Sequence, residues 1–253
     1  MPVTEAISRT MPIIEPKEKE IWRYLGYRNE EPGQDIKDRI AHCVEALQRE
    51  CTPKHVQREF SLEILPAETA DAVPEGEKTD RTTPVIHLHD LAITSGSLAK
   101  NLQGCEKALI FAATLGHAPD RLIRRASVTH MSDAVIYQAV AAEMIEAYCD
   151  SLNDEWKASY GLRGWCLHPR FSPGYGDLSL SLQRDIIRLL DTPRRIGLTL
   201  TKSLIMLPSK SVTAIIGLEQ RDPDRGSSEP NAHCASSRSG CASCALIDCL
   251  YRR

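Results

Sequence analysis

The spacing of apolar residues predicts one amphipathic helix early in the chain, over residues 35–51. Its apolar positions recur every three or four residues, as on one face of a helix, and Pro53 ends it. These positions are Ile36, Ile40, Cys43, Val44 and Leu47. Apolar and polar residues then alternate over 58–64, which is typical of a strand. The polar, proline-containing segment 66–84 is predicted to be a loop, and 85–91 a second strand.

The middle of the chain predicts a buried strand and a long helical region. A short helix capped by Ser95 or Ser97 precedes a continuous apolar run, residues 107–116, which is bounded by glycine. Such a run is typical of a central strand that is covered on both faces. A helical region is predicted over residues 119–158, with a break near Thr129.

The last third predicts a helix and then strands. Residues 179–191 form an amphipathic pattern whose apolar face holds Leu182, Ile186, Leu189 and Leu190. Residues 195–219 predict two or three antiparallel strands, broken at 208–210. Because helices and strands do not alternate regularly, the fold class is predicted to be α+β rather than a doubly wound sheet. We expect one domain over residues 1–220, and a linker with a Cys-rich tail over 221–253.

Composition narrows the class of protein. The chain has 253 residues, of which 42% are hydrophobic and 26% charged, as in an ordinary globular domain. Its formal net charge is −3, and the lack of a basic excess argues against nucleic acid as a partner. No apolar run approaches the length of a membrane span, and the first twenty residues lack the pattern of a signal peptide. We therefore expect a cytoplasmic protein without a membrane partner.

The nine cysteines fall into two groups. Four lie within the last twenty residues with the spacing Cys-x6-Cys-x2-Cys-x4-Cys, and they are predicted to hold a metal: Cys234, Cys241, Cys244 and Cys249. Four thiolates suit zinc or an iron–sulfur cluster, but the spacing is not a standard ferredoxin run. An iron–sulfur cluster, structural zinc and redox thiols without metal all stay open. The other five are predicted to be small buried hydrophobes: Cys43, Cys51, Cys105, Cys149 and Cys166.

Glu143 stands out because it falls within the apolar stripe of its predicted helix. An unpaired carboxylate there costs free energy or shifts its pKa. One interpretation is a buried glutamate paired with a structural arginine or lysine; the other is a carboxylate held for a cationic ligand. Glu146, with Asp150 as its neighbour, is predicted to face solvent instead.

The segment "RFSPGYGD", residues 170–177, is the second unusual feature. The Arg170 guanidinium suits a carboxylate or phosphate, Gly174 lets a ligand approach the backbone, and Tyr175 adds a flat face with a hydroxyl. A plain turn between strand and helix, with Arg170 on the surface, is the alternative. An arginine together with a buried glutamate would suit a zwitterion, so an amino-acid-like ligand fits the pair.

These motifs resemble the activation domain of vitamin B12-dependent methionine synthase, which binds S-adenosylmethionine. "RFSPGYGD" resembles the family's Arg-x-Ala-Pro-Gly-Tyr signature, and "LTLTKSLIMLPSKSV" resembles its Leu-Thr-x-Ser-x-x-Met-x-Pro-x-x-Ser-Val stretch. "AAEMIEAY" resembles the helix that carries a ligand-binding glutamate, and "WRYLGYR" resembles small stand-alone versions of the domain. The resemblance to the synthase's own domain extends over residues 104–218, and "WRYLGYR" lies ahead of that range.

The resemblance implies a helmet-like α+β domain around a twisted antiparallel sheet. It also implies an S-adenosylmethionine site made of Glu143, Arg170, Ser172, Gly174 and Tyr175. Ser172 stands where the family has alanine, which is a small change if the contact is through the backbone. No catalytic residue in the strict sense is implied, because the domain's contribution is positioning and a dry site.

The sequence contains none of the synthase's homocysteine, folate or cobalamin modules, so the resemblance implies a cobalamin held elsewhere. The partner would be a cobalamin-binding methionine synthase or another corrinoid protein. The chain would support the reductive methylation of cob(II)alamin, which needs one electron and the methyl group of S-adenosylmethionine. The electron would come from a donor such as flavodoxin or ferredoxin, or through an iron–sulfur cluster on the cysteine tail. Two other functions stay open: an S-adenosylmethionine-binding module without methyl transfer, and an iron–sulfur electron carrier.

Overall fold

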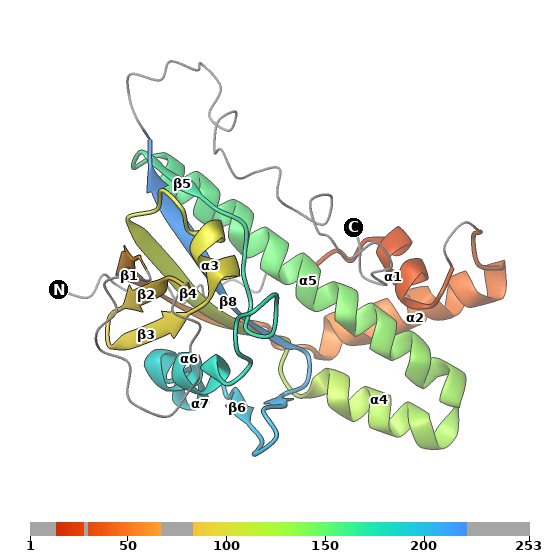
Figure 1. The fold of residues 1–253 in the computed structure, drawn as a ribbon. Coiled ribbons are helices and arrows are strands. Elements are labelled where there is room, and N and C mark those ends of the chain that lie inside the picture. Colours follow the sequence, from red (N-terminus) through yellow and green to blue (C-terminus); the bar gives the residue numbers. More distant parts are fainter. Residues whose placement is uncertain (1–13, 28–29, 67–82, 222–253) are drawn as a thin grey trace.

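The computed structural model describes residues 14–27, 30–66 and 83–221, and within them an antiparallel sheet carries helices on both faces (Figure 1). The strands are β1 (Lys54–Leu65), β2 (Val85–Leu88), β3 (Leu91–Thr94), β4 (Lys107–Thr114), β5 (Trp165–Leu167), β6 (Thr199–Leu200), β7 (Met206–Leu207) and β8 (Ser211–Gln220). The helices are α1 (Glu18–Tyr24), α2 (Gln34–Glu50), α3 (Gly96–Asn101), α4 (Ala118–Thr129), α5 (Met131–Gly161), α6 (Leu182–Leu190) and α7 (Thr192–Arg195). The main sheet has the order β3-β2-β1-β4-β8-β5, and β6 pairs with β7 separately. This confirms the predicted α+β class.

Strand β4 forms the centre of the sheet, between β1 and β8, and its alternation divides the core in two. Leu109 and Phe111 point to the face covered by α5, whereas Ala108 and Ile110 point to the face covered by α6. All four side chains are buried. A strand covered on both faces needs apolar residues at every position, which is why this segment reads as a continuous apolar run.

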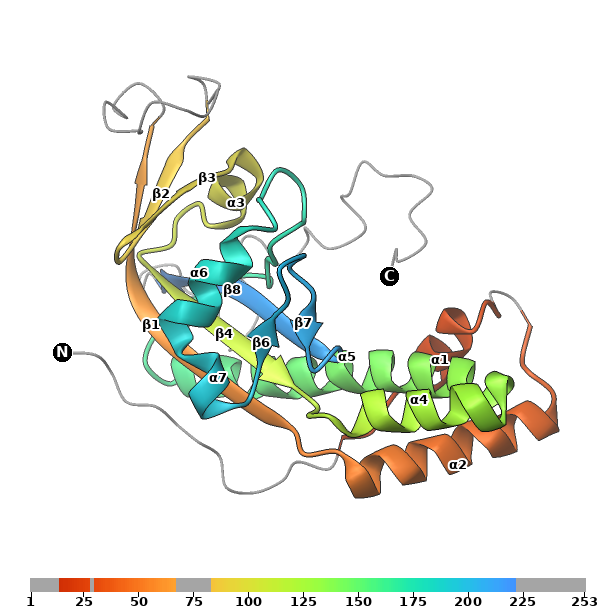
Figure 2. The ribbon, with the colours of Figure 1, turned by 90° about the horizontal axis from the view of Figure 1, so that it is seen from below.

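The two groups of helices lie on opposite faces of a strongly twisted sheet (Figure 2). Helices α1, α2, α4 and α5 form one layer, where Trp156 of α5 meets the Phe111 ring edge-on at 5.0 Å between centroids. On the other face, Ile186 and Leu190 of α6 pack against β4 and β1. The long helix α5 therefore runs across the sheet beside the end of β5, and this places its polar side chains near the segment that follows β5.

The predicted elements are largely confirmed, with corrections where turns decide the boundaries. The break in the helical region falls at His130, next to the predicted position. The strand predicted over 85–91 is confirmed as β2, but it ends at Leu88, because His89 adopts a positive φ of 55° and turns the chain back into β3. Strand β1 is longer than the alternation indicated, and it begins at Lys54. The segment predicted to form two or three strands, residues 195–219, holds three: β6, β7 and β8.

Four of the five scattered cysteines are buried as predicted, but Cys105 is only half-buried, beside Gly217. Residues 67–82 of the predicted loop, and all four cysteines of the predicted metal site, lie outside the described residues. Within the part of the chain that the structure describes, no helix combines the length and the apolar character that crossing a bilayer requires.

Candidate functional site

The segment after β5 forms a tight turn that returns the chain to α6. Phe171 exchanges backbone hydrogen bonds of 2.9 Å with Ile215 of β8, which extends the sheet by one bridge. Gly174 has a φ of +92°, and its N–H donates to the carbonyl of Leu178 at 2.9 Å. A positive φ of this size strongly favours glycine, so the predicted turn at this position is confirmed.

Asp177 fixes the far end of this turn to the start of α3. Its carboxylate accepts hydrogen bonds from Ser95 Oγ at 2.5 Å, from the N–H of Gly96 at 2.7 Å and from the N–H of Ser97 at 3.1 Å. Burial opposes ionisation of the carboxyl, but these hydrogen bonds outweigh it and hold the pKa of Asp177 below its usual value. Ser95 is itself the predicted helix cap, because its Oγ accepts from the N–H of Leu98. Sequence reasoning missed the role of Asp177.

Arg170 turns towards α5 rather than towards solvent. Its Nη2 donates to Asp150 Oδ1 at 2.8 Å and to Glu146 Oε2 at 3.4 Å, and its side chain is 21% exposed. The prediction that Glu146 faces solvent is therefore wrong, because this residue is half-buried against Arg170. Among the described residues, the buried Nη1 atom of Arg170 has no hydrogen-bond partner. Nη2 is thus engaged by two carboxylates of α5, whereas the buried Nη1 faces no acceptor among the described residues.

Glu143 lies on the same face of α5 and is 2% exposed, as the apolar stripe predicted. Its Oε1 accepts a hydrogen bond of 3.4 Å from the backbone N–H of Lys17. The Lys17 ammonium reaches Asp150 Oδ2 at 3.3 Å. We call Glu143, Glu146 and Asp150 the acidic row, and residues 14–17 the N-terminal strap. The strap and Arg170 therefore meet the acidic row from two sides.

Cys149 lies beside this row and is fully buried. Burial raises the pKa of its thiol to about 12, although the nearby Arg170 guanidinium acts in the opposite direction. The thiol is consequently protonated at neutral pH, and this cysteine is a packing residue rather than a nucleophile.

The remaining predicted site residues lie in the turn itself. Ser172 is half-buried, Gly174 is exposed, and the Tyr175 side chain is 67% exposed to solvent. The structure thus brings Arg170 and Glu143 to one face of α5, and it leaves the Tyr175 ring at the surface of the turn. The role of these residues in holding a ligand stays a prediction.

His168 is a further residue that sequence reasoning missed. It is buried two positions before Arg170, with Nδ1 at 2.7 Å from the carbonyl oxygen of Asn101 and Nε2 at 2.8 Å from Glu219 Oε2. These contacts join the end of β5 to α3 and β8. The only signal in the sequence was a histidine directly after the apolar β5, which by itself predicts no partner.

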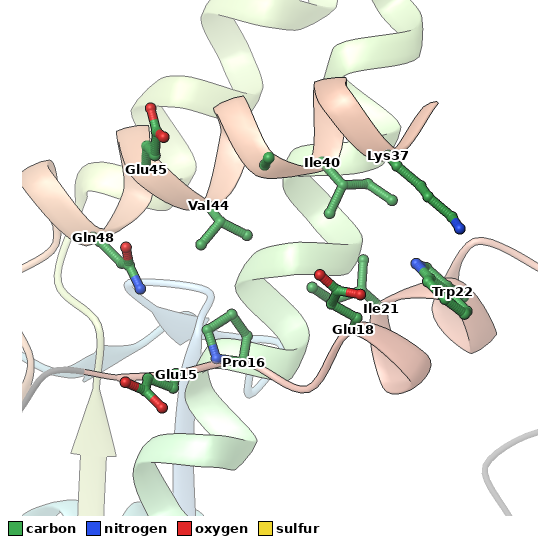
Figure 3. Close-up of a pocket in the computed structure, with 11 residues that line it drawn as sticks. Glu15, Pro16, Glu18, Ile21, Trp22, Lys37, Ile40, Val44, Glu45 and Gln48 are labelled. Atoms are coloured by element: carbon green, nitrogen blue, oxygen red, sulfur yellow. The ribbon is translucent and has the colours of Figure 1, made fainter. Parts of the chain in front are cut away.

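A pocket of about 350 Å³ lies between α1 and α2, and the N-terminal strap forms part of its wall (Figure 3). Glu15 and Pro16 of the strap line it, whereas the next residue, Lys17, reaches the acidic row. The other lining residues are Glu18, Ile21, Trp22, Lys37, Ile40, Ala41, Val44, Glu45 and Gln48. None of the predicted site residues lines this pocket, so it is separate from the Arg170 turn.

No group of three histidine, cysteine, aspartate or glutamate side chains in the described residues is arranged to hold a metal ion. The predicted ligands Cys234, Cys241, Cys244 and Cys249 lie outside those residues, and that site stays a prediction.

Comparison with known proteins gives a match at the level of the fold. No protein-family model and no curated protein matches this chain. Among solved structures, the chain is similar to the crystal structure of the MetH reactivation domain bound to AdoHcy. The TM-score is 0.54 and the sequence identity 15%, over 90% of this chain and 80% of that one. At this identity the likeness shows the fold alone, and it confirms the predicted relationship to that domain as one of fold.

Proposed function

We propose that this chain binds S-adenosylmethionine and acts as a reactivation factor for a cobalamin held by a separate protein. That protein would be a cobalamin-dependent methionine synthase or another corrinoid protein. The reaction reduces cob(II)alamin by one electron and then transfers a methyl cation to it from S-adenosylmethionine, which leaves S-adenosylhomocysteine. The electron comes from a one-electron donor of low potential, such as flavodoxin or ferredoxin.

The observation that carries this proposal is the fold shared with a domain bound to AdoHcy, together with the Arg170 turn beside the acidic row. AdoHcy is the product that S-adenosylmethionine leaves after methyl transfer. The Nη1 atom of Arg170 supports ligand binding by an observation that does not depend on this likeness. A buried guanidinium nitrogen without a partner among the described residues is the donor that a ligand carboxylate needs.

In this proposal the residues of this chain bind and orient the methyl donor. Arg170 takes the carboxylate, the backbone of Ser172 and Gly174 lies against the ligand, and Tyr175 offers its ring at the rim. Glu143, buried in α5, favours the positive charge of the ammonium or sulfonium. Holding the methyl group in line with the cobalt reduces the entropic part of the barrier, so no acid–base residue is needed.

Calorimetric titration of anaerobically purified full-length protein with S-adenosylmethionine tests binding. We expect saturable binding that Arg170→Ala weakens at least tenfold, which corresponds to about 1.4 kcal/mol. Arg188→Ala is the matched control, because Arg188 is exposed on α6 and pairs only at the surface with Asp185. Absence of binding by the wild-type protein, alone and mixed with a corrinoid protein, would reject the proposal.

A second assay separates reactivation from simple binding. The protein is mixed with a corrinoid protein in the cob(II) state, a reductant and methyl-labelled S-adenosylmethionine, and the label on cobalamin is followed. Transfer that depends on this protein supports reactivation. Binding without transfer would indicate an S-adenosylmethionine-binding module instead. Iron and zinc analysis of the same preparation tests the cysteine tail as the electron carrier, since zinc without iron would exclude an iron–sulfur cluster.

A further inference from the structure

We propose that Asp150 is a positioning residue for Arg170: it holds one side of the guanidinium against α5 and leaves Nη1 for the carboxylate of the ligand. This inference rests on the proposed function and assigns a role to a residue outside the predicted site.

The contacts favour Asp150 over its neighbour on the acidic row. Arg170 Nη2 lies 2.8 Å from Asp150 Oδ1, but 3.4 Å from Glu146 Oε2. The second oxygen of Asp150, Oδ2, is held by the Lys17 ammonium at 3.3 Å. The Asp150 carboxylate is therefore fixed from two sides, and it belongs to a 31-residue helix whose neighbouring side chains Cys149 and Leu152 are buried.

A fixed guanidinium matters because a free arginine side chain samples many rotamers. Ordering this side chain costs conformational entropy, and that cost weakens binding if the ligand must impose the order. Asp150 orders Arg170 before the ligand arrives, so that cost falls on folding instead. The benefit applies only to ligands that use Arg170.

The charges of this cluster also select the ligand. Glu143, Glu146 and Asp150 carry a formal charge of −3, and Lys17 and Arg170 carry +2, which leaves −1. A simple anion is disfavoured by that excess, whereas a zwitterion that carries one more positive charge is favoured. S-adenosylmethionine has that form, since its carboxylate is accompanied by an ammonium and a sulfonium.

The test compares two ligands that differ at the amino-acid end. Calorimetry measures the affinity of the wild-type protein, Asp150→Asn and Asp150→Glu for S-adenosylmethionine and for 5′-methylthioadenosine, which lacks that end. We expect Asp150→Asn to weaken the binding of S-adenosylmethionine at least tenfold and to change the affinity for methylthioadenosine by less than twofold. Asp150→Glu should restore part of the affinity for S-adenosylmethionine. Asp154→Asn, an exposed residue of α5 that pairs with Lys157, should change neither. Unchanged affinity for S-adenosylmethionine, or an equal loss for both ligands, would overturn the assignment.

A ligand-free measurement keeps this inference separable from the proposed function. In nitrogen-15 spectra of the wild-type protein, the Nη protons of Arg170 should be protected and sharp because the guanidinium is held. Asp150→Asn should abolish those signals, and Asp154→Asn should leave them. Retained signals in Asp150→Asn would reject the positioning role, whether or not the protein binds S-adenosylmethionine.

Discussion

Asp177 should stabilise the protein because its carboxylate joins the Arg170 turn to α3. Removing it in Asp177→Ala takes the acceptor from the N–H groups of Gly96 and Ser97 and from the buried hydroxyl of Ser95. The two N–H groups are exposed and can turn to water, so their loss resembles that of a helix cap, about 1 kcal/mol. The buried hydroxyl loses its acceptor, which adds about 1 kcal/mol.

The expected total is therefore about 2 kcal/mol. For a domain of this size, thermal unfolding at pH 7 should show a midpoint lower by about 4–8 °C. Asp177→Asn keeps one acceptor oxygen and should lose about half as much. Asp185→Ala is the control, because the Asp185 ion pair with Arg188 lies at the surface and contributes little.

The pH dependence gives the sharper test. Because the pKa of Asp177 is lowered in the folded protein, its stabilisation is complete above the unfolded pKa and is lost as the pH falls through the folded one. The difference between wild type and Asp177→Asn should thus be constant near neutrality and shrink below about pH 4. A midpoint for Asp177→Ala within 1 °C of wild type, taken as about the error of such a measurement, or a difference that persists unchanged in acid, would refute the reasoning.

Three further predictions concern the scaffold around the site. In urea unfolding, Gly176→Ala should destabilise the protein by more than Gly197→Ala. Both glycines have a positive φ, but a Cβ at position 176 would lie 2.7 Å from Ser97 Oγ, whereas a Cβ at position 197 would meet open space. Burial lowers the pKa of His55, so the free energy of unfolding should fall as the pH drops below about 6.5. In unfolding measurements at pH 5–7, His55→Gln should reduce the slope of this free energy against pH by up to about 1.4 kcal/mol per pH unit. An unchanged slope would contradict this. Phe111→Ala should cost about 3–5 kcal/mol in urea unfolding, because this side chain is fully buried under α5, and a cost below 1 kcal/mol would contradict the two-faced core.

Local patterns were sufficient to predict most of the fold. The apolar run at β4, the cap at Ser95 and the break next to His130 each depend on neighbouring residues, and each is found. The turn at His89 was missed because a non-glycine residue with positive φ has no reliable signal in sequence. The turn ends β2 three residues before the predicted limit, and β3 follows it from Leu91.

The candidate site was harder to predict because its contacts are tertiary. The burial of Glu143 followed from helical periodicity alone. The pairing of Arg170 with Asp150, 20 positions apart, depends on the path of the chain between them, which returns along α5, and no spacing rule predicts it. The contact of Lys17 with Asp150 joins residues 133 positions apart, and no sequence pattern predicts it either.

The N-terminal strap has a practical consequence for handling this protein. Residues 14–17 touch the acidic row through Lys17 and line the neighbouring pocket through Glu15 and Pro16. A truncation that removes residues 14–17 would take away the backbone donor to Glu143 and the ammonium that pairs with Asp150. A change in ligand affinity after such a truncation would report the loss of these contacts rather than damage to the Arg170 turn. Shortened versions of the chain used for titrations should therefore keep these four residues.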